Sequence, residues 1–402
     1  MQNTIKITED LYYIGCSDRK ISLFENVYPV PNGISYNSYF LDDEKTVLFD
    51  TVDKSCSGQF FDNLNAVLNG RNLDYLIINH LEPDHSALIK DVVDRHPQVK
   101  IVCNAKTKQM LNQFFAFAND IEQNIELIQE GSILNTGKHE FTFVMAPMVH
   151  WPEAMVTFDI TDKILFSADA FGSFGALNGN IFDNEVDFEL KIDEYRRYYT
   201  NIVGKYGPQV NALLNKANAL DVNMICPLHG LILKENIAKM IEYYSLWANY
   251  IPEEKSVLIA YASIYGGTQN AAEIIATKLA QKGLKNIKIY DVSQTHNSYI
   301  ISDAFKYSHI VIASTTYNNG IFVNMAHFID DLIKHNLQNR TFAIIENGSW
   351  ACMCGNLIQN ELEKLKGAKI LDKKITIKST TKEAQEFEIN ELVNLIIDDI
   401  NS

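Results

Sequence analysis

Residues 79–87 of the chain read NHLEPDHSA and place four side chains that can bind a metal ion within six positions: His80, Glu82, Asp84 and His85. An apolar run at 75–78, YLII, precedes them and predicts a buried strand, and a helix-like run follows. In a loop these side chains can converge, whereas a strand would alternate them between two faces. A solvated loop whose acid caps the next helix explains any one of the four residues, but it does not explain all four together.

Three more candidates each stand at the end of a strand-like run. His150 follows FTFVMAPMV, Asp169 follows KILFSA, and His229 follows NMICPL. A lone histidine in such a place is more often a core residue that packs without binding a metal. If the strands run in register, however, all three polar side chains reach the same end of the sheets as the loop at 79–87. The joint pattern therefore predicts a single metal site.

The first 250 residues mix short strand-like runs with helical ones. The strand-like runs are LYYIGC, NSYFLDD, TVLFDT, DYLIIN, KIVCNA, FTFVMAP, AMVTFDI, KILFSAD and NMICPL. Helical spacing occurs near 57–69, 86–96, 106–118, 193–218 and 235–249. Close pairs such as NSYFLDD and KTVLFD predict hairpins, so an αββα sandwich of mixed sheets is favoured over a parallel barrel.

From about residue 254 the pattern changes to five β/α repeats within roughly 150 residues, which predicts a doubly wound parallel sheet. The boundary is expected near IPEE at 251–254, which gives a first domain at 1–251 and a second at 252–402.

Three loops of the second domain follow its first, third and fourth strands. SIYGGT offers backbone N–H groups and hydroxyls at a helix N-terminus, which suits a phosphate. No lysine follows its glycines, so it is not a nucleotide-triphosphate loop. The other two loops add the aromatic faces of Tyr317 and Trp350 beside this cradle, which suit an isoalloxazine ring, although either one alone is equally explained by packing within its loop. The candidate cofactor-binding residues are Ser263, Ile264, Tyr265, Gly266, Gly267, Thr268, Ser314, Thr315, Thr316, Tyr317, Asn318, Asn319, Gly320, Asn347, Gly348, Ser349 and Trp350.

The metal pattern resembles the metallo-β-lactamase superfamily, in which H-x-H-x-D-H with a later His, Asp and His holds two metals. Here Glu82 replaces the second histidine, which is the mark of the flavodiiron proteins (A-type flavoproteins). The segments HWPEAM, SADAFG and ENGSW and the flavodoxin-like S-x-Y-G-x-T loop are similar to that family as well. The resemblance implies seven iron ligands, which are His80, Glu82 and His150 for one iron, Asp84, His85 and His229 for the other, and Asp169 as the bridge.

The resemblance implies an oxidoreductase in which FMN passes electrons from an external donor to a diiron centre. That centre reduces O₂ to water or NO to N₂O, with O₂ favoured here. A rubredoxin-like protein is the expected donor, and a head-to-tail homodimer or a dimer of dimers is the expected assembly. The residues agree independently, because four imidazoles and three carboxylates without a thiolate suit iron or manganese as well as zinc.

Two alternatives stay open. One is a dizinc hydrolase of the metallo-β-lactamase type with an accessory flavodoxin-like domain, and the other is an electron carrier with a vestigial metal site. The chain also departs from the family at Phe24-Glu25-Asn26, where many members carry a histidine near the irons. Glu25 is interpreted as a pocket residue, whereas Tyr195 and Tyr199 are interpreted as packing residues.

Composition limits the other possibilities. The net charge of −15 argues against nucleic-acid binding. No apolar run reaches the eighteen or so residues of a membrane helix, and the first residues lack the layout of a signal peptide. We therefore expect a cytoplasmic protein without a membrane partner. The six scattered cysteines have no C-x-x-C spacing, which predicts reduced thiols and no rubredoxin-type iron site within these residues.

Overall fold

The computed structural model describes residues 2–117 and 121–402, which form two compact units. Unit 1 comprises Met1–Tyr199 and Pro208–Ser245, and unit 2 comprises Thr200–Gly207 and Leu246–Ser402. The expected domain boundary between residues 251 and 252 stays a prediction. None of the described helices is both long enough and apolar enough to cross a membrane.

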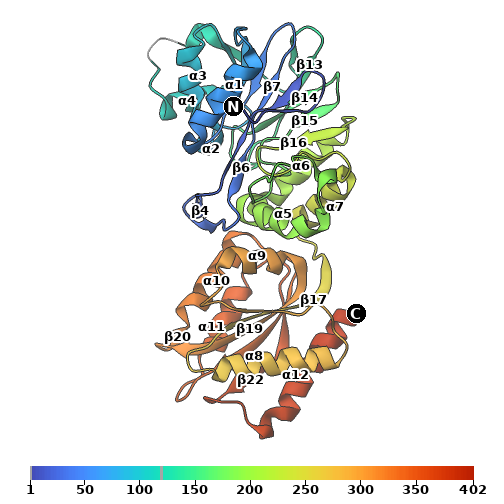
Figure 1. The fold of residues 1–402 in the computed structure, drawn as a ribbon. Coiled ribbons are helices and arrows are strands. Elements are labelled where there is room, and N and C mark those ends of the chain that lie inside the picture. Colours follow the sequence, from blue (N-terminus) through green and yellow to red (C-terminus); the bar gives the residue numbers. More distant parts are fainter. Residues whose placement is uncertain (1, 118–120) are drawn as a thin grey trace. The chain divides into compact units, whose positions relative to one another are not determined.

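Unit 1 contains the predicted sandwich of two mixed sheets (Figure 1). The seven-stranded sheet has the order β1 (Ile5–Lys6), β2 (Leu11–Tyr13), β7 (Tyr39–Leu41), β8 (Val47–Phe49), β9 (Tyr75–Ile77), β10 (Lys100–Asn104) and β11 (Ile125–Ile128). The five-stranded sheet has the order β12 (Ile133–Asn135), β13 (Glu140–Met145), β14 (Met155–Asp159), β15 (Ile164–Phe166) and β16 (Met224–Cys226). The predicted hairpin β7–β8 is antiparallel, whereas β8, β9, β10 and β11 run parallel.

The core of unit 1 lies between these two sheets. Phe49 of β8 stacks on Phe166 of β15, with ring centroids 3.8 Å apart and planes inclined by 8°. Both rings are buried in a cluster that draws apolar side chains from both sheets. Apolar burial of this kind drives the two sheets together, and it fixes the strand ends that carry the polar loops.

Helices flank the sandwich. They are α1 (Ser57–Leu68), α2 (Pro83–Ser86), α3 (Ile89–Arg95), α4 (Ala105–Phe114), α5 (Ile192–Tyr198), α6 (Gly207–Ala217) and α7 (Ile237–Ala248). The side chain of Asn104 accepts hydrogen bonds from the backbone N–H groups of Lys106 and Thr107, which explains why α4 begins there. Figure 1 shows α1, α3 and α4 grouped on one side of unit 1 and α5, α6 and α7 grouped on another.

Unit 2 is the predicted doubly wound sheet, with the parallel order β18-β17-β19-β21-β22. Its strands are β17 (Glu254–Ala262), β18 (Lys288–Asp291), β19 (Tyr307–Tyr317), β21 (Thr341–Asn347) and β22 (Lys369–Ile377), and the short β20 (Gly320–Ile321) pairs with β19. Its helices are α8 (Gly267–Gln281), α9 (Asn297–Lys306), α10 (Val323–Lys334), α11 (Cys354–Leu362) and α12 (Glu386–Asn401).

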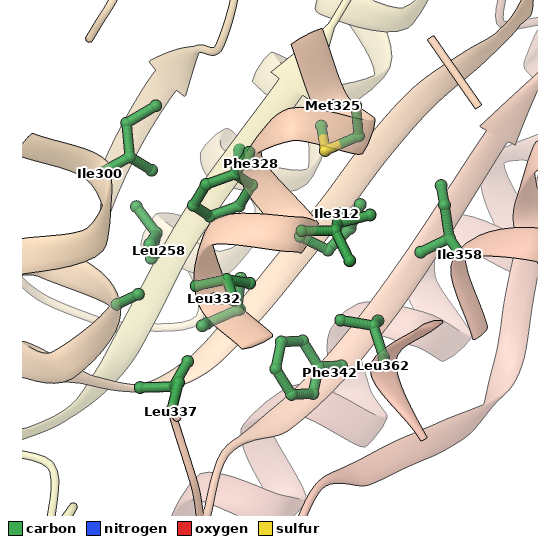
Figure 2. Packing of buried hydrophobic residues seen from close by; sticks show 14 of the residues in the cluster. Leu258, Ile300, Ile312, Met325, Phe328, Leu332, Leu337, Phe342, Ile358 and Leu362 are labelled. Atoms are coloured by element: carbon green, nitrogen blue, oxygen red, sulfur yellow. The ribbon is translucent and has the colours of Figure 1, made fainter. Parts of the chain in front are cut away.

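Two apolar clusters hold the helices of unit 2 against its sheet. Side chains of α9, α10 and α11 form one cluster, and side chains of α8 and α12 form the other. In the first cluster, Phe328 of α10 points toward Leu258 and Ile312 of the strands (Figure 2). The near-continuous apolar strands of the sequence are therefore explained by burial on both faces of the sheet.

The expectation that the cysteines are reduced thiols was wrong for one pair. Cys16 and Cys56 form a disulfide with their Cα atoms 6.4 Å apart, which lies within the ordinary range. Forty positions separate them in sequence, so spacing rules could not pair them. The short strand β3 (Cys16–Asp18) and the 3₁₀ turn Lys54–Cys56 bring them together.

A buried histidine joins two loops of unit 1. The ring of His139 contacts two carboxylates, with Nδ1 2.7 Å from Oδ2 of Asp159 and Nε2 3.1 Å from Oδ2 of Asp10. Burial lowers the pKa of His139, but the hydrogen bonds to Asp159 and Asp10 outweigh this effect and raise the pKa to about 9. His139 is therefore an imidazolium at neutral pH.

We expect this ion cluster to make the local stability of unit 1 depend on pH. Its folded pKa exceeds the unfolded value of about 6.5, so the stabilisation is complete below that pH and is lost as pH rises through 9. Hydrogen exchange of β13 and β14 should show the opening free energy falling by about 2 kcal/mol between pH 6 and pH 9.5. In His139→Gln this fall should vanish. The exposed His327→Gln is the control and should keep it; a fall that persists in His139→Gln would contradict the assignment.

Candidate metal and flavin sites

The loop at 79–87 is held from below by one buried carboxylate. Asp50, just after β8, accepts hydrogen bonds from the backbone N–H of Asn79 at 2.7 Å and of His80 at 3.2 Å, and from the Asn79 side chain at 2.8 Å. Pro83 then stands at the first position of α2, where its missing N–H costs nothing. Parallel strands β8 and β9 thus deliver a fixed loop at their carboxyl ends.

His80, Glu82, His150 and Asp169 form a first group, whose ligand atoms all lie within 4.8 Å of one another. Nε2 of His150 lies 2.9 Å from Oε2 of Glu82. Nε2 of His80 lies 3.3 Å from the same oxygen and 3.2 Å from Oδ2 of Asp169. Loops from both sheets contribute to this group.

Asp84, His85 and His229 form a second group. The Nε2 atoms of His85 and His229 are 2.9 Å apart, and each lies 3.3 Å from Oδ2 of Asp84. Asp169 reaches this group as well, because its Oδ1 lies 3.3 Å from Nε2 of His85 while its Oδ2 faces the first group. One carboxylate therefore offers one oxygen to each group, as a bridging ligand does.

The orientation of the rings fits metal ligation. Nδ1 of His80 lies 2.9 Å from Oε1 of Glu153, and Nδ1 of His229 lies 2.7 Å from the carbonyl oxygen of Ser35. These Nδ1 atoms must donate to their acceptors, which leaves the Nε2 lone pair of each neutral ring pointing into the site. Lone pairs aimed at carboxylates and at each other repel unless positive charge lies between them.

Orphaned oxygens support the same conclusion. Among the described residues, both carboxylate oxygens of Asp84 and of Asp169 are buried without a hydrogen-bond partner. Buried polar atoms without partners are rare and need an explanation. Two divalent cations would satisfy these oxygens and the imidazole lone pairs together, so the residues present fit a dinuclear metal centre.

The pKa shifts within the site show that its carboxylates stabilise positive charge on their neighbours. Burial lowers the pKa of His80 and of His150, but the neighbouring carboxylates outweigh it, so that the pKa of His150 rises to about 9 and that of His80 rises well above 6.5. Burial raises the pKa of Glu82 and of Asp169, but the surrounding histidines lower both well below the usual range. Without a metal, the raised pKa values keep His80 and His150 protonated beside the ionised carboxylates. Bound metal ions would replace these protons.

All seven predicted ligands thus meet in these two adjoining groups, while the sequence interpretation missed the residues that orient them. Glu153 was quoted only as part of HWPEAM, although its position three residues after His150 was a usable signal. Ser35 gave no signal, because it lies within β6 (Ile34–Tyr36) and meets His229 across 194 positions of sequence. Asp50 follows β8, so its place after a strand was a usable signal that the interpretation passed over. Glu25 is an exposed residue whose carboxyl group hydrogen-bonds Glu82, and partial desolvation together with the charge of Glu82 raises the pKa of Glu25 to about 8. This contact supports its interpretation as a pocket residue.

Tyrosines form one wall of the site. Tyr198 is buried, its ring centroid lies 5.2 Å from that of His229, and its hydroxyl has no hydrogen-bond partner among the described residues. The sequence interpretation did not single it out. Tyr195 packs on Phe188, with centroids 5.5 Å apart, and Tyr199 packs on Tyr244, with centroids 4.9 Å apart. Both contacts agree with the packing role expected for Tyr195 and Tyr199.

In unit 2 a cleft opens at the carboxyl ends of the parallel strands. It collects residues of all three predicted loops, namely Ser263, Ile264, Tyr265, Gly266, Gly267, Thr268, Thr315, Thr316, Asn318, Asn319, Asn347, Ser349 and Trp350. Four predicted residues do not line it, namely Ser314, Tyr317, Gly320 and Gly348. Four other residues do line it, namely Asn270, Ala351, Ser379 and Thr380. Ser379 and Thr380 follow the fifth strand, so the same strand-end rule could have found them.

The cleft fits a flavin mononucleotide. The N-terminus of α8 opens into it, and Gly266 at its N-cap has a φ of +86°, a left-handed conformation that favours glycine. Such a turn exposes backbone N–H groups to a phosphate. Trp350 and Tyr265 are 92% and 99% exposed, which leaves two aromatic faces free at the mouth of the cleft.

Comparisons with known proteins match both parts of the chain. A family model described as "ODP family beta lactamase" matches residues 34–230, and the flavodoxin model matches residues 259–391. The anaerobic nitric oxide reductase flavorubredoxin of Vibrio vulnificus is 30% identical over 352 residues, which cover 86% of this chain and 70% of that protein. The nitric oxide reductase of Moorella thermoacetica is 28% identical over 373 residues, covering 92% and 91%.

Solved structures share the whole fold. The rubredoxin oxygen:oxidoreductase of Desulfovibrio gigas superposes with a TM-score of 0.92 at 25% identity, covering 99% of this chain and 98% of that one. The flavodiiron protein of Giardia intestinalis gives a TM-score of 0.92 at 24% identity, covering 99% and 97%.

Replacing Glu153 should weaken metal binding. In Glu153→Gln the charge that polarises the His80 ring is removed while the shape is kept, so metal affinity should fall by about tenfold or more. Competition with a coloured Fe²⁺ chelator measures this affinity. The exposed Glu130→Gln is the control and should bind as the wild type does. Equal affinity in both variants would show that Glu153 does not support the metal site.

Replacing Gly267 should weaken flavin binding. A Cβ at this position would lie 2.0 Å from the backbone oxygen of Ser379, which is impossible without moving a wall of the cleft. We expect Gly267→Ala to lower FMN affinity by about tenfold or more, which corresponds to at least 1.4 kcal/mol. Quenching of flavin fluorescence on binding reports the affinity. Gly58→Ala, where a Cβ meets open space, should bind FMN normally.

Proposed function

This chain belongs to the flavodiiron protein family and is an oxidoreductase, and we propose that it reduces O₂ to water and NO to N₂O, with O₂ favoured. In this proposal the seven residues of the two metal groups bind two iron ions. The cleft of unit 2 binds FMN.

The position of Asp169 carries the proposal. Its two buried oxygens face two different groups of histidine and carboxylate ligands, so two metal ions would be held side by side. A pair of adjacent metals with nitrogen and oxygen ligands can bind a small molecule between them. Glu82 in the place of a histidine makes the ligand set harder and more anionic, which suits iron better than a zinc pair.

When bound, FMN would accept single electrons from a donor, and the two irons would deliver them to the gas. The chain itself supplies the rest. Burial of the ligands excludes bulk water, since His80, His85 and Asp169 are each no more than 1% exposed. The Tyr198 hydroxyl has no partner within the described part of the chain, so it could donate a hydrogen bond to a small molecule beside His229. Glu153 and Ser35 keep the rings aimed while the substrate binds.

The partners follow from the relatives and the charge. The names of the Vibrio and Desulfovibrio proteins contain rubredoxin, and we propose a separate rubredoxin-like protein as the electron donor. The assembly that we propose is a head-to-tail homodimer, or a dimer of such dimers, in the cytoplasm. The net charge of −15 agrees with a protein that binds neither nucleic acid nor anionic membrane.

Turnover by the purified protein tests the proposal. We expect two irons and one FMN per chain, and rapid consumption of O₂ and of NO by the chemically reduced protein in an anaerobic cell with gas electrodes. O₂ should be consumed faster than NO. Glu82→His, which recreates the hydrolase-type pattern, should lose most of the gas reduction, whereas Glu130→Gln should not. Two zinc ions with hydrolysis of a thioester or lactam, and no gas consumption, would overturn the proposal in favour of a hydrolase.

A further inference from the structure

The Cys16–Cys56 disulfide joins two segments that support the same metal group. Cys56 ends the segment 50–56 that contacts the backbone of His85, and Cys16 begins strand β3, whose partner β6 contacts His229. His85 and His229 are the two histidines of the second group. The covalent bond therefore links the supports of two ligands that lie far apart in sequence.

On the Cys56 side the connection runs through Thr51. Its backbone N–H and its hydroxyl both donate to the carbonyl oxygen of His85, each at 2.8 Å. Asp50, the residue before it, holds the backbone of His80. Five positions after Thr51 the segment reaches Cys56, whose N–H donates to the carbonyl of Asp53 at 3.0 Å. Because only five positions separate Thr51 from Cys56, we expect a displacement of Cys56 to shift Thr51 as well.

On the Cys16 side the connection runs through β6 (Ile34–Tyr36). Cys16 pairs with Tyr36 in the antiparallel ladder. The neighbouring Ser35 accepts the Nδ1 hydrogen of His229 at 2.7 Å, and its hydroxyl accepts from the N–H of Gly230 at 2.7 Å. The ring of Tyr36 also lies against both His85 and His229, with centroids 6.4 Å and 5.9 Å away.

The pair is placed for exchange with an external thiol. Cys56 is half-buried, and Lys54, Ser55 and Gly58 around it are exposed, whereas Cys16 is only 2% exposed. Cys56 is also the N-cap of α1, a helix of 12 residues, so a thiolate there faces the positive end of the helix dipole. Accessible cysteines at helix N-termini are the reactive ones, whereas structural disulfides are buried.

We propose that Cys16–Cys56 is a reversible redox site, opened by a dithiol protein or small dithiol, and that opening it loosens the backbone around His85 and His229. The predicted loosening of the backbone follows from the contacts described above. A faster release of iron after reduction would follow as well, and only this second expectation rests on the proposed function. Disulfides that do form in reducing compartments are usually of this exchangeable kind.

The exchange is a two-electron reduction of the protein. A thiolate of the dithiol attacks Sγ of the half-buried Cys56, the S–S bond breaks, and Cys16 leaves as a thiolate and takes up a proton. The second thiol of the reductant then attacks the mixed disulfide and releases Cys56 as a thiolate at the start of α1. The reductant ends as a disulfide, and an oxidised dithiol or a peroxide reverses the change.

Hydrogen exchange on the full chain, with and without dithiothreitol, tests the proposal directly. Peptides that cover residues 84–88 and 228–231 should exchange at least threefold faster after reduction, in both metal-free and iron-loaded protein. Peptides of β13 and β14 are the internal reference and should not change. In the iron-loaded protein, transfer of iron to a chelator should also accelerate at least threefold. The metal-free arm keeps this test separate from the proposed function.

Variants identify the cysteines responsible. Cys56→Ser should exchange like the reduced wild type and should ignore dithiothreitol, and Cys16→Ser should do the same. Cys352→Ser, which removes a half-buried thiol outside the pair, should keep the full response. Equal exchange of oxidised and reduced wild type, or a response that survives in Cys56→Ser, would overturn the proposal. So would alkylation and mass measurement that find six free thiols in the protein equilibrated with oxidised dithiothreitol.

Discussion

Concentrated negative charge in a dry place is the constraint on which unit 1 depends. Glu82, Asp84 and Asp169 are brought together with imidazole lone pairs in a largely buried site, an arrangement that no apolar core would tolerate without cations. Hydrogen bonds from the surrounding fold hold the charged residues in place. Asp50 fixes the loop and Glu153 fixes a ring, so that the ligands stay close even though they repel one another.

The seven ligand candidates could be predicted because each stands where a strand ends. Strands of a sheet share their edges, so a sequence that places His150 or His229 after an apolar run also indicates where it lies in space. The architecture of both units followed from the same periodicities. The supports could not be predicted, since Ser35 meets His229 across 194 positions and Glu153 meets His80 across 73. Only tertiary contacts define these supports. The Cys16–Cys56 disulfide was not predicted for the same reason, because its two cysteines are 40 positions apart in sequence.

The cleft of unit 2 differs from the metal groups of unit 1 in the polar groups that it offers to a ligand. A flavin phosphate needs donors rather than acceptors, and the carboxyl ends of parallel strands supply them from backbone N–H groups and hydroxyls. Its buried carboxylate, Glu346, acts within the protein, since it accepts from the N–H of Gly355 at 3.0 Å and from the hydroxyl of Thr376 at 2.8 Å. Prediction there named all three loops but included four residues that do not line the cleft, and it missed the loop after the fifth strand, where Ser379 and Thr380 complete the cleft.

The turn from His150 to Glu153 has a consequence for how this sequence can change over evolutionary time. The turn presents one candidate ligand at its start and the partner of another candidate, His80, three positions later. Inserting or deleting a single residue between His150 and Glu153 would move at least one of these two side chains out of place. Homologous chains should therefore accept length variation in their surface hairpins while this turn keeps a constant number of residues.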